Sequence, residues 1–124
     1  KPYKIRWKET ELVREKLKAL GLYPRNNGYE IYVTDTVCGR CYYDKKCITI
    51  PLWTLETPLE DDPEYFIYYA CHELAHSLAP ASFGNHHGGN FMMYFKALCP
   101  AHLWHHELEY KPRLAAAAGI KKKC

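Results

Sequence analysis

Residues 62–78 read DPEYFIYYACHELAHSL, and they carry the strongest helical pattern in the chain. Asp62 can cap a helix, and Pro63 suits the first helical turn because its missing N–H would have no partner there anyway. The apolar side chains then recur at helical spacing and form one continuous stripe. These are Ile67, Ala70, Cys71, Leu74, Ala75 and Leu78. We therefore expect a helix over this range that buries one face, and Pro80 disfavours its continuation.

A helix and a small sheet are expected before this central helix. Residues 10–20 place apolar side chains at helical spacing, and Thr10 can cap that helix. Residues 29–37 are rich in β-branched and aromatic side chains, which is typical of a strand. Residues 41–43 and 47–52 are two shorter strand candidates, and the polar residues between them suit a turn.

Two further helices are expected after the central one. A glycine-rich loop, SFGNHHGGN at 82–90, separates them from it. The helical pattern resumes over 91–98, is interrupted by Pro100, and can continue over 101–118. A chain of 124 residues suits one core. We expect a single α+β domain with an N-terminal helix, about three strands, the central helix beneath that sheet, and C-terminal helices.

Residues 72–76 of the central helix spell HELAH, an H-E-x-x-H motif. Histidines four apart project from one helix face, so both imidazoles can reach the same ion. Glu73 stands beside that ion and can move a proton between a water molecule and a leaving group. Zinc suits this chemistry because it lowers the pKa of a water molecule that it binds to around 7. The motif predicts a zinc metallohydrolase with His72 and His76 as ligands, against the alternative of two ordinary helical histidines.

A third ligand is expected, because a catalytic zinc usually has three protein ligands and one open position. The metzincin spacing would place it at Ser82, which cannot serve as that histidine, so this subclass is excluded. His86 and His87 lie in the glycine-rich loop and are both candidates. Glu107 and Glu109 would be the candidates in a gluzincin-like arrangement.

The HELAH motif together with residues 87–91, HGGNF, resembles the SprT-like zinc metallopeptidases, which pair H-E-x-x-H with a later histidine in an H-G-x-x-F context. The resemblance covers about residues 29–99, and its specific part is 72–91. It implies a zincin-like metallopeptidase domain spanning 1–124, in which His72, His76 and His87 hold zinc. It also implies that Glu73 is the catalytic base and that Phe91 packs beneath the loop.

These features predict a peptidase that hydrolyses a peptide or protein substrate. Zinc peptidases commonly align an extended peptide along an exposed strand, and residues 38–50 are the candidate here. The alternative is a non-catalytic structural or assembly protein that keeps the fold and the metal. The intact motif favours catalysis, because a purely structural zinc site has no use for Glu73. A hydrolase acting on a non-peptide amide is a third reading.

Three further histidines lie close together near the C-terminal end of the sequence. His102, His105 and His106 have partly helical spacing, and we expect them on a solvated or packing face. A second metal cluster is the alternative. One of these histidines, or Tyr110, could instead polarise a substrate carbonyl.

Six cysteines occur, and three of them are close in sequence: Cys38, Cys41 and Cys47. The second C-x-x-C that would complete a four-ligand zinc site is missing. We therefore expect free, half-buried thiols, with a disulfide or a second metal site as alternatives. Cys71, next to the first ligand, is expected to pack in the core.

The net charge of +3 is concentrated at the two ends, which is typical of solvated tails, with a nucleic-acid contact as the weaker alternative. No run of about 18 apolar residues occurs, so no membrane partner is expected. The first residues lack the apolar centre of a signal peptide. We expect a cytoplasmic protein with reduced thiols. The oligomeric state is not predicted.

Overall fold

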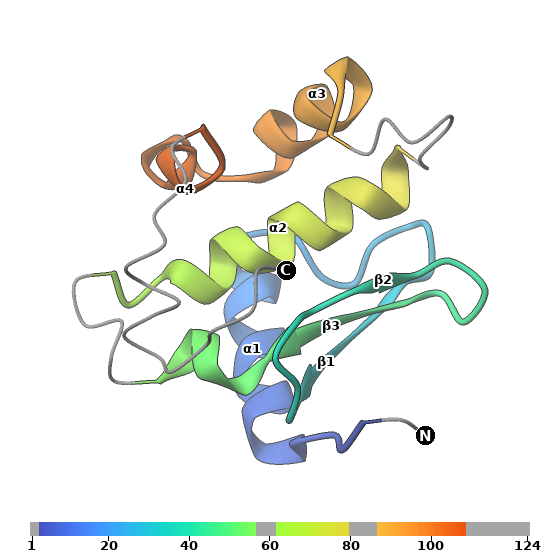
Figure 1. Cartoon of the computed structure of the whole chain (residues 1–124), viewed down its shortest axis with the longest axis vertical. Helices are drawn as coiled ribbons and strands as arrows, with labels where there is room; N and C mark the ends of the chain where they lie inside the picture. Colours follow the sequence, from blue (N-terminus) through green and yellow to red (C-terminus); the bar gives the residue numbers. More distant parts are fainter. Residues whose placement is uncertain (1–2, 57–61, 80–86, 109–124) are drawn as a thin grey trace.

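The computed structural model of the protein describes residues 3–56, 62–79 and 87–108. These residues form a mixed α/β fold with four α-helices and one three-stranded sheet. In Figure 1, α2 crosses the molecule between the sheet on one side and α3 and α4 on the other. Within the described ranges, none of the helices has the length and apolar character needed to cross a membrane. The elements in chain order, with η for short 3-10 helices, are α1 (Trp7–Ala19), β1 (Glu30–Thr34), β2 (Cys41–Tyr42), β3 (Cys47–Pro51), η1 (Leu52–Leu55), α2 (Tyr65–Leu78), α3 (Gly89–Leu98), η3 (Ala101–Leu103) and α4 (His105–Leu108).

The sheet has the order β1-β3-β2, with β1 parallel and β2 antiparallel to the central strand β3. Ile31 is in register with Ile48, and Val33 with Ile50, so these four side chains share one face. All four are fully buried and belong to one core cluster with the apolar side chains of α2. The expected combination of helices with a three-stranded sheet is thereby confirmed.

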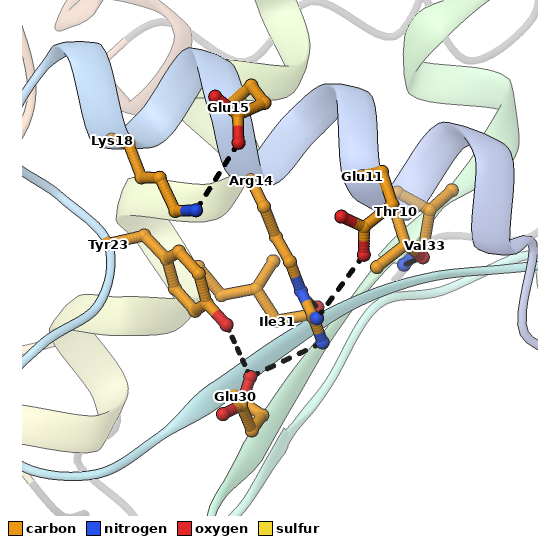
Figure 2. A network of polar contacts seen from close by, with 9 residues as sticks. All are labelled: Thr10, Glu11, Arg14, Glu15, Lys18, Tyr23, Glu30, Ile31 and Val33. Atoms are coloured by element: carbon orange, nitrogen blue, oxygen red, sulfur yellow. Dashed lines mark hydrogen bonds and ion pairs between the residues drawn. The ribbon is translucent and has the colours of Figure 1, made fainter.

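The outer edge of β1 is closed by α1. Figure 2 shows Arg14 reaching from the helix to the strand, where its Nε donates a hydrogen bond to the Ile31 carbonyl at 2.9 Å. The Val33 N–H donates to the Thr10 hydroxyl at 2.9 Å, and the Val33 carbonyl accepts from the Arg6 N–H at 2.8 Å. These contacts occupy the groups through which another strand could pair.

The role of Thr10 corrects the expected start of α1. The helix begins at Trp7, with Arg6 at the N-cap position, rather than at residue 10. Thr10 lies inside the helix, fully buried, and its hydroxyl contacts the β1 backbone instead of capping the helix. A capping residue and a buried strand contact use the same side-chain oxygen, and the sequence pattern does not separate them.

The other edge of the sheet, β2, is open on its outer side within the described residues. On its inner side, the Thr49 N–H donates to the Arg40 carbonyl at 2.9 Å. Gly39 sits where this segment passes closest to its neighbours. A Cβ there would lie 2.3 Å from the Thr49 carbonyl oxygen and 2.5 Å from the Tyr69 ring. Gly39 therefore lets the β2 segment lie directly against β3 and α2, and its N–H donates to the Tyr69 hydroxyl at 2.8 Å.

The C-terminal part differs from the expected single helix over 101–118. A 3-10 turn covers Ala101–Leu103, Trp104 follows in a turn, and α4 begins at His105. The Trp104 indole N–H donates to the Cys99 carbonyl at 2.7 Å, which holds this corner beside the end of α3. The remainder of the expected helix, residues 109–118, lies outside the described residues.

Candidate metal centre

Three imidazole nitrogens converge on one point beside α2. His72 and His76 come from α2, and His87 precedes α3. Their Nε2 atoms are 3.3 Å apart for His72 and His76, 3.1 Å for His76 and His87, and 3.3 Å for His72 and His87. Three nitrogens bound tetrahedrally to zinc at about 2.05 Å would be about 3.3 Å apart. The spacing of the three atoms therefore fits a tetrahedral zinc ion.

Hydrogen bonds cannot join all three pairs of these nitrogens at the same time. Each Nε2 is either protonated, and donates, or unprotonated, and accepts. With two states and three mutually close atoms, at least two atoms share a state. At least one pair then meets proton to proton or lone pair to lone pair, which is repulsive. A cation removes the conflict because all three lone pairs can point at it.

Glu107 fixes the orientation of the first ligand. Its Oε1 accepts a hydrogen bond from His72 Nδ1 at 2.6 Å and another from the Tyr68 hydroxyl at 2.9 Å. Because Nδ1 carries the proton, the Nε2 lone pair of His72 is free to face His76 and His87. Burial by itself would raise the pKa of Glu107, but the hydrogen bond and charge of His72 and the hydrogen bond of Tyr68 lower it. This carboxylate–histidine arrangement is common behind zinc ligands.

The ring of Phe91 packs against all three imidazoles. Its ring centroid lies 5.0 Å from that of His72, 4.7 Å from His76 and 4.9 Å from His87. The side chain is only 2% exposed and belongs to the main core cluster. Phe91 is the third residue of α3. The packing of α3 against α2 therefore also positions the segment that carries His87.

Glu73 is a buried carboxylate in α2, directly after His72. It is 6% exposed, and burial raises its pKa to about 7, although the charges of His72 and Arg40 act in the opposite direction. Burial, followed by the charge of Glu73, raises the pKa of Cys41 at the start of β2 to about 12. A carboxylate with a pKa near neutrality is suited to accept and release a proton.

The other candidate ligands have different partners. Glu107 holds His72 from behind instead of joining the three nitrogens. His102 contacts Glu64 at 2.7 Å, and His106 contacts Asp62. His86, Glu109 and Tyr110 lie outside the described residues.

Four of the cysteines are free thiols: Cys41, Cys47, Cys71 and Cys99. Cys38 is disulfide-bonded, so the expectation of free thiols is wrong for this residue, and it is not bonded to Cys41 of its own C-x-x-C pair. Cys71 is fully buried, and a hydrogen bond with Cys99, together with burial, raises its pKa well above the ordinary range. Among the described residues, neither of the two groups of side chains that could hold a metal ion contains a cysteine.

Comparisons with protein-family models, with curated proteins and with solved structures gave no match to this chain. The chemical interpretation of the site therefore rests on its own residues. Two of them, Glu107 and Gly39, were not recognised from the sequence in the roles that they have. Glu107 is 35 residues from His72, and no spacing rule joins a zinc ligand to the carboxylate behind it. A glycine inside C-G-R-C can indicate that the backbone passes close to a neighbouring element. The flanking cysteines suggested thiol or metal chemistry instead.

Proposed function

We propose that the protein is a zinc-dependent metallopeptidase of the SprT-like, zincin-like kind. His72, His76 and His87 would hold the ion, and Glu73 would be the general base. The observation that carries this proposal is the triangle of Nε2 atoms with edges of 3.1–3.3 Å. A zinc ion held there would polarise a scissile carbonyl and make a water molecule acidic enough to attack at neutral pH.

Glu73 has the surroundings that proton transfer needs. No hydrogen bond or ion pair joins its carboxylate to another described residue, although the residue is only 6% exposed. Burial raises the pKa of this carboxylate to about 7, which makes it basic enough to accept a proton near neutral pH. Glu73 accepts a proton from the attacking water and passes it to the departing amine. A proton acceptor next to His72 favours catalysis over a purely structural metal protein.

The open edge of β2 supports a peptide as substrate. The charge of Glu73 raises the pKa of Cys41, the first residue of β2, and the outer backbone groups of this edge face away from β3. An extended peptide can pair with such an edge through its main chain, independent of its sequence. The opposite edge of the sheet is closed by Thr10 and Arg14, so β2 is the edge available for pairing among the described residues.

The test compares the zinc-loaded protein with Glu73→Gln on an unfolded protein substrate. We expect the variant to keep its tightly bound zinc while turnover falls by about 10²–10⁴-fold, the usual contribution of a general base. Glu64→Gln is the matched control, because Glu64 is an exposed carboxylate just before the same helix, and it should leave turnover unchanged. A fully active Glu73→Gln protein, or a well-folded wild type that binds no zinc, would contradict the proposal.

A further inference from the structure

A second group of metal-ligating side chains lies beside the start of α2. It consists of Asp62, in the turn before the helix, and of His105 and His106 at the start of α4. One ligand atom from each residue lies within 4.8 Å of the others. The rings of the two histidines are 4.0 Å apart between centroids. This group is separate from the three histidines described above and shares no residue with them.

We propose that Asp62, His105 and His106 form a second binding site for a divalent transition-metal ion such as Zn²⁺. Two imidazoles with one carboxylate are the ligands that zinc and its neighbours in the first transition series accept. Ca²⁺ and Mg²⁺ prefer sites made of oxygen atoms, so the two nitrogens disfavour them.

The competing interpretation is a simple ion pair between Asp62 and His106. A carboxylate oxygen and an imidazole nitrogen face each other both when they share a proton and, at a wider separation, when they bind one metal ion. The presence of His105 within reach distinguishes this group from a pair. The nearby pair of His102 and Glu64, 2.7 Å apart, has no third ligand among the described residues.

The Asp62–His106 pair is also more buried than the His102–Glu64 pair. The His106 side chain is 3% exposed and that of Asp62 17%, whereas the side chains of His102 and Glu64 are 62% and 48% exposed. The His106 ring also packs edge-on against Tyr65, with centroids 4.9 Å apart. The Asp62–His106 contact is therefore held in a fixed place, as a ligand pair must be.

The proposed site requires small adjustments on binding. Ligand atoms around a tetrahedral zinc ion are about 3.3 Å apart, and those of this group lie within 4.8 Å of one another, so no separation has to shorten by more than about 1.5 Å. His105 is half-buried, which leaves room for its side chain to rotate. The ion must also replace the proton between Asp62 and His106. Both costs make this site weaker than the one formed by His72, His76 and His87.

The chain connects the two sites directly. Glu107, which holds His72 Nδ1, follows His106 in α4. An ion that joins α4 to the start of α2 would therefore also fix the short helix that presents Glu107. Binding at the second site should strengthen binding at the first, and by thermodynamic reciprocity the reverse holds as well.

The experiment is a titration of the metal-free protein with Co²⁺, followed by its visible absorption, with Zn²⁺ competition as a check. We expect two equivalents per chain, a tight one and a weaker one, without the absorption band of a cobalt–thiolate bond. His105→Ala should lose the weaker equivalent only. His102→Ala is the matched control, since it removes a histidine that contacts a carboxylate outside the group, and it should bind both equivalents.

A wild type that binds a single equivalent would overturn the proposal. So would a weaker equivalent that persists in both His105→Ala and Asp62→Asn. If His105→Ala does not fold, proton NMR of the wild type decides the question. The second equivalent of Zn²⁺ must then shift the ring resonances of His105 and His106. His76→Ala separates the two proposals, because it should lose the tight equivalent and keep the weaker one.

Discussion

The two groups of histidines at the two ends of α2 use their ring nitrogens differently. In the first, the Nε2 atoms of His72, His76 and His87 face one another at 3.1–3.3 Å. In the second, Nε2 of His106 faces a carboxylate oxygen of Asp62. Three nitrogens cannot all share protons, whereas a nitrogen and a carboxylate can. The first group is therefore suited to a cation, whereas a proton can join the two partners of the second.

The two groups also differ in which ring nitrogen of the histidine contacts the carboxylate. Glu107 contacts His72 at Nδ1, which leaves Nε2 available as a ligand. Asp62 and Glu64 contact His106 and His102 at Nε2, the atom that would otherwise be available. A carboxylate at Nδ1 can stay in place when a metal ion binds Nε2, whereas a metal ion bound between Asp62 and His106 must first replace their shared proton.

The largest effect is expected from His76→Ala, which removes one atom of the first group. Structural zinc sites gain about 10–16 kcal/mol from four ligands, so one ligand contributes roughly 3 kcal/mol, or about 100-fold in affinity. Competition with a chelator should show at least this loss for the tight equivalent. The weaker equivalent at Asp62 should remain, with its affinity lowered only by the loss of coupling to the first site. Retention of tight binding would mean that the three nitrogens do not form the zinc site.

The next largest effect is expected from Glu107→Gln, which tests the carboxylate behind His72. A glutamine can still accept from Nδ1, but it carries no charge, and loss of such a partner typically weakens metal binding by about 10–100-fold. The matched control is Glu64→Gln, whose partner His102 lies outside both groups. Equal metal affinities for the two variants would show that Glu107 does not support the ligand.

The structure confirms the elements that local periodicity defines and corrects those that depend on distant contacts. The helix over Tyr65–Leu78 and the strand at Cys47–Pro51 follow from residues within each segment. The start of α1 was placed three residues late, because Thr10 contacts a strand 23 residues away. No pattern within a helix reveals such a contact.

The residues of the candidate site likewise fall into those predicted from local spacing and those brought together by distant contacts. His72, Glu73 and His76 belong to one helix, so their spacing alone predicts that they act together. Glu107 and Asp62 approach histidines 35 and 44 positions away, and only the packing of α4 against α2 brings them there. For this reason His105 and His106 were considered together with His102, whereas the structure groups them with Asp62.

A smaller effect is expected from His106→Ala, this time on folding. The variant leaves the Asp62 carboxylate, 17% exposed, without its imidazole. Removing one partner from a buried ion pair costs about 3–5 kcal/mol, and partial exposure of Asp62 should reduce this to roughly 2 kcal/mol. Urea unfolding of the metal-free protein measures the change. A loss below about 0.5 kcal/mol would show that the pair contributes little without metal.

The smallest effect is expected from His102→Ala, the exposed counterpart of that variant. His102 and Glu64 are 2.7 Å apart, but their side chains are 62% and 48% exposed. Exposed ion pairs contribute about 0–1 kcal/mol, so the unfolding free energy should change within that range. Each variant removes an imidazole that contacts a carboxylate just before α2. If His102→Ala proves as costly as His106→Ala, burial is not what distinguishes the pairs, and the argument that Asp62 and His106 are held in place as metal ligands loses its main support.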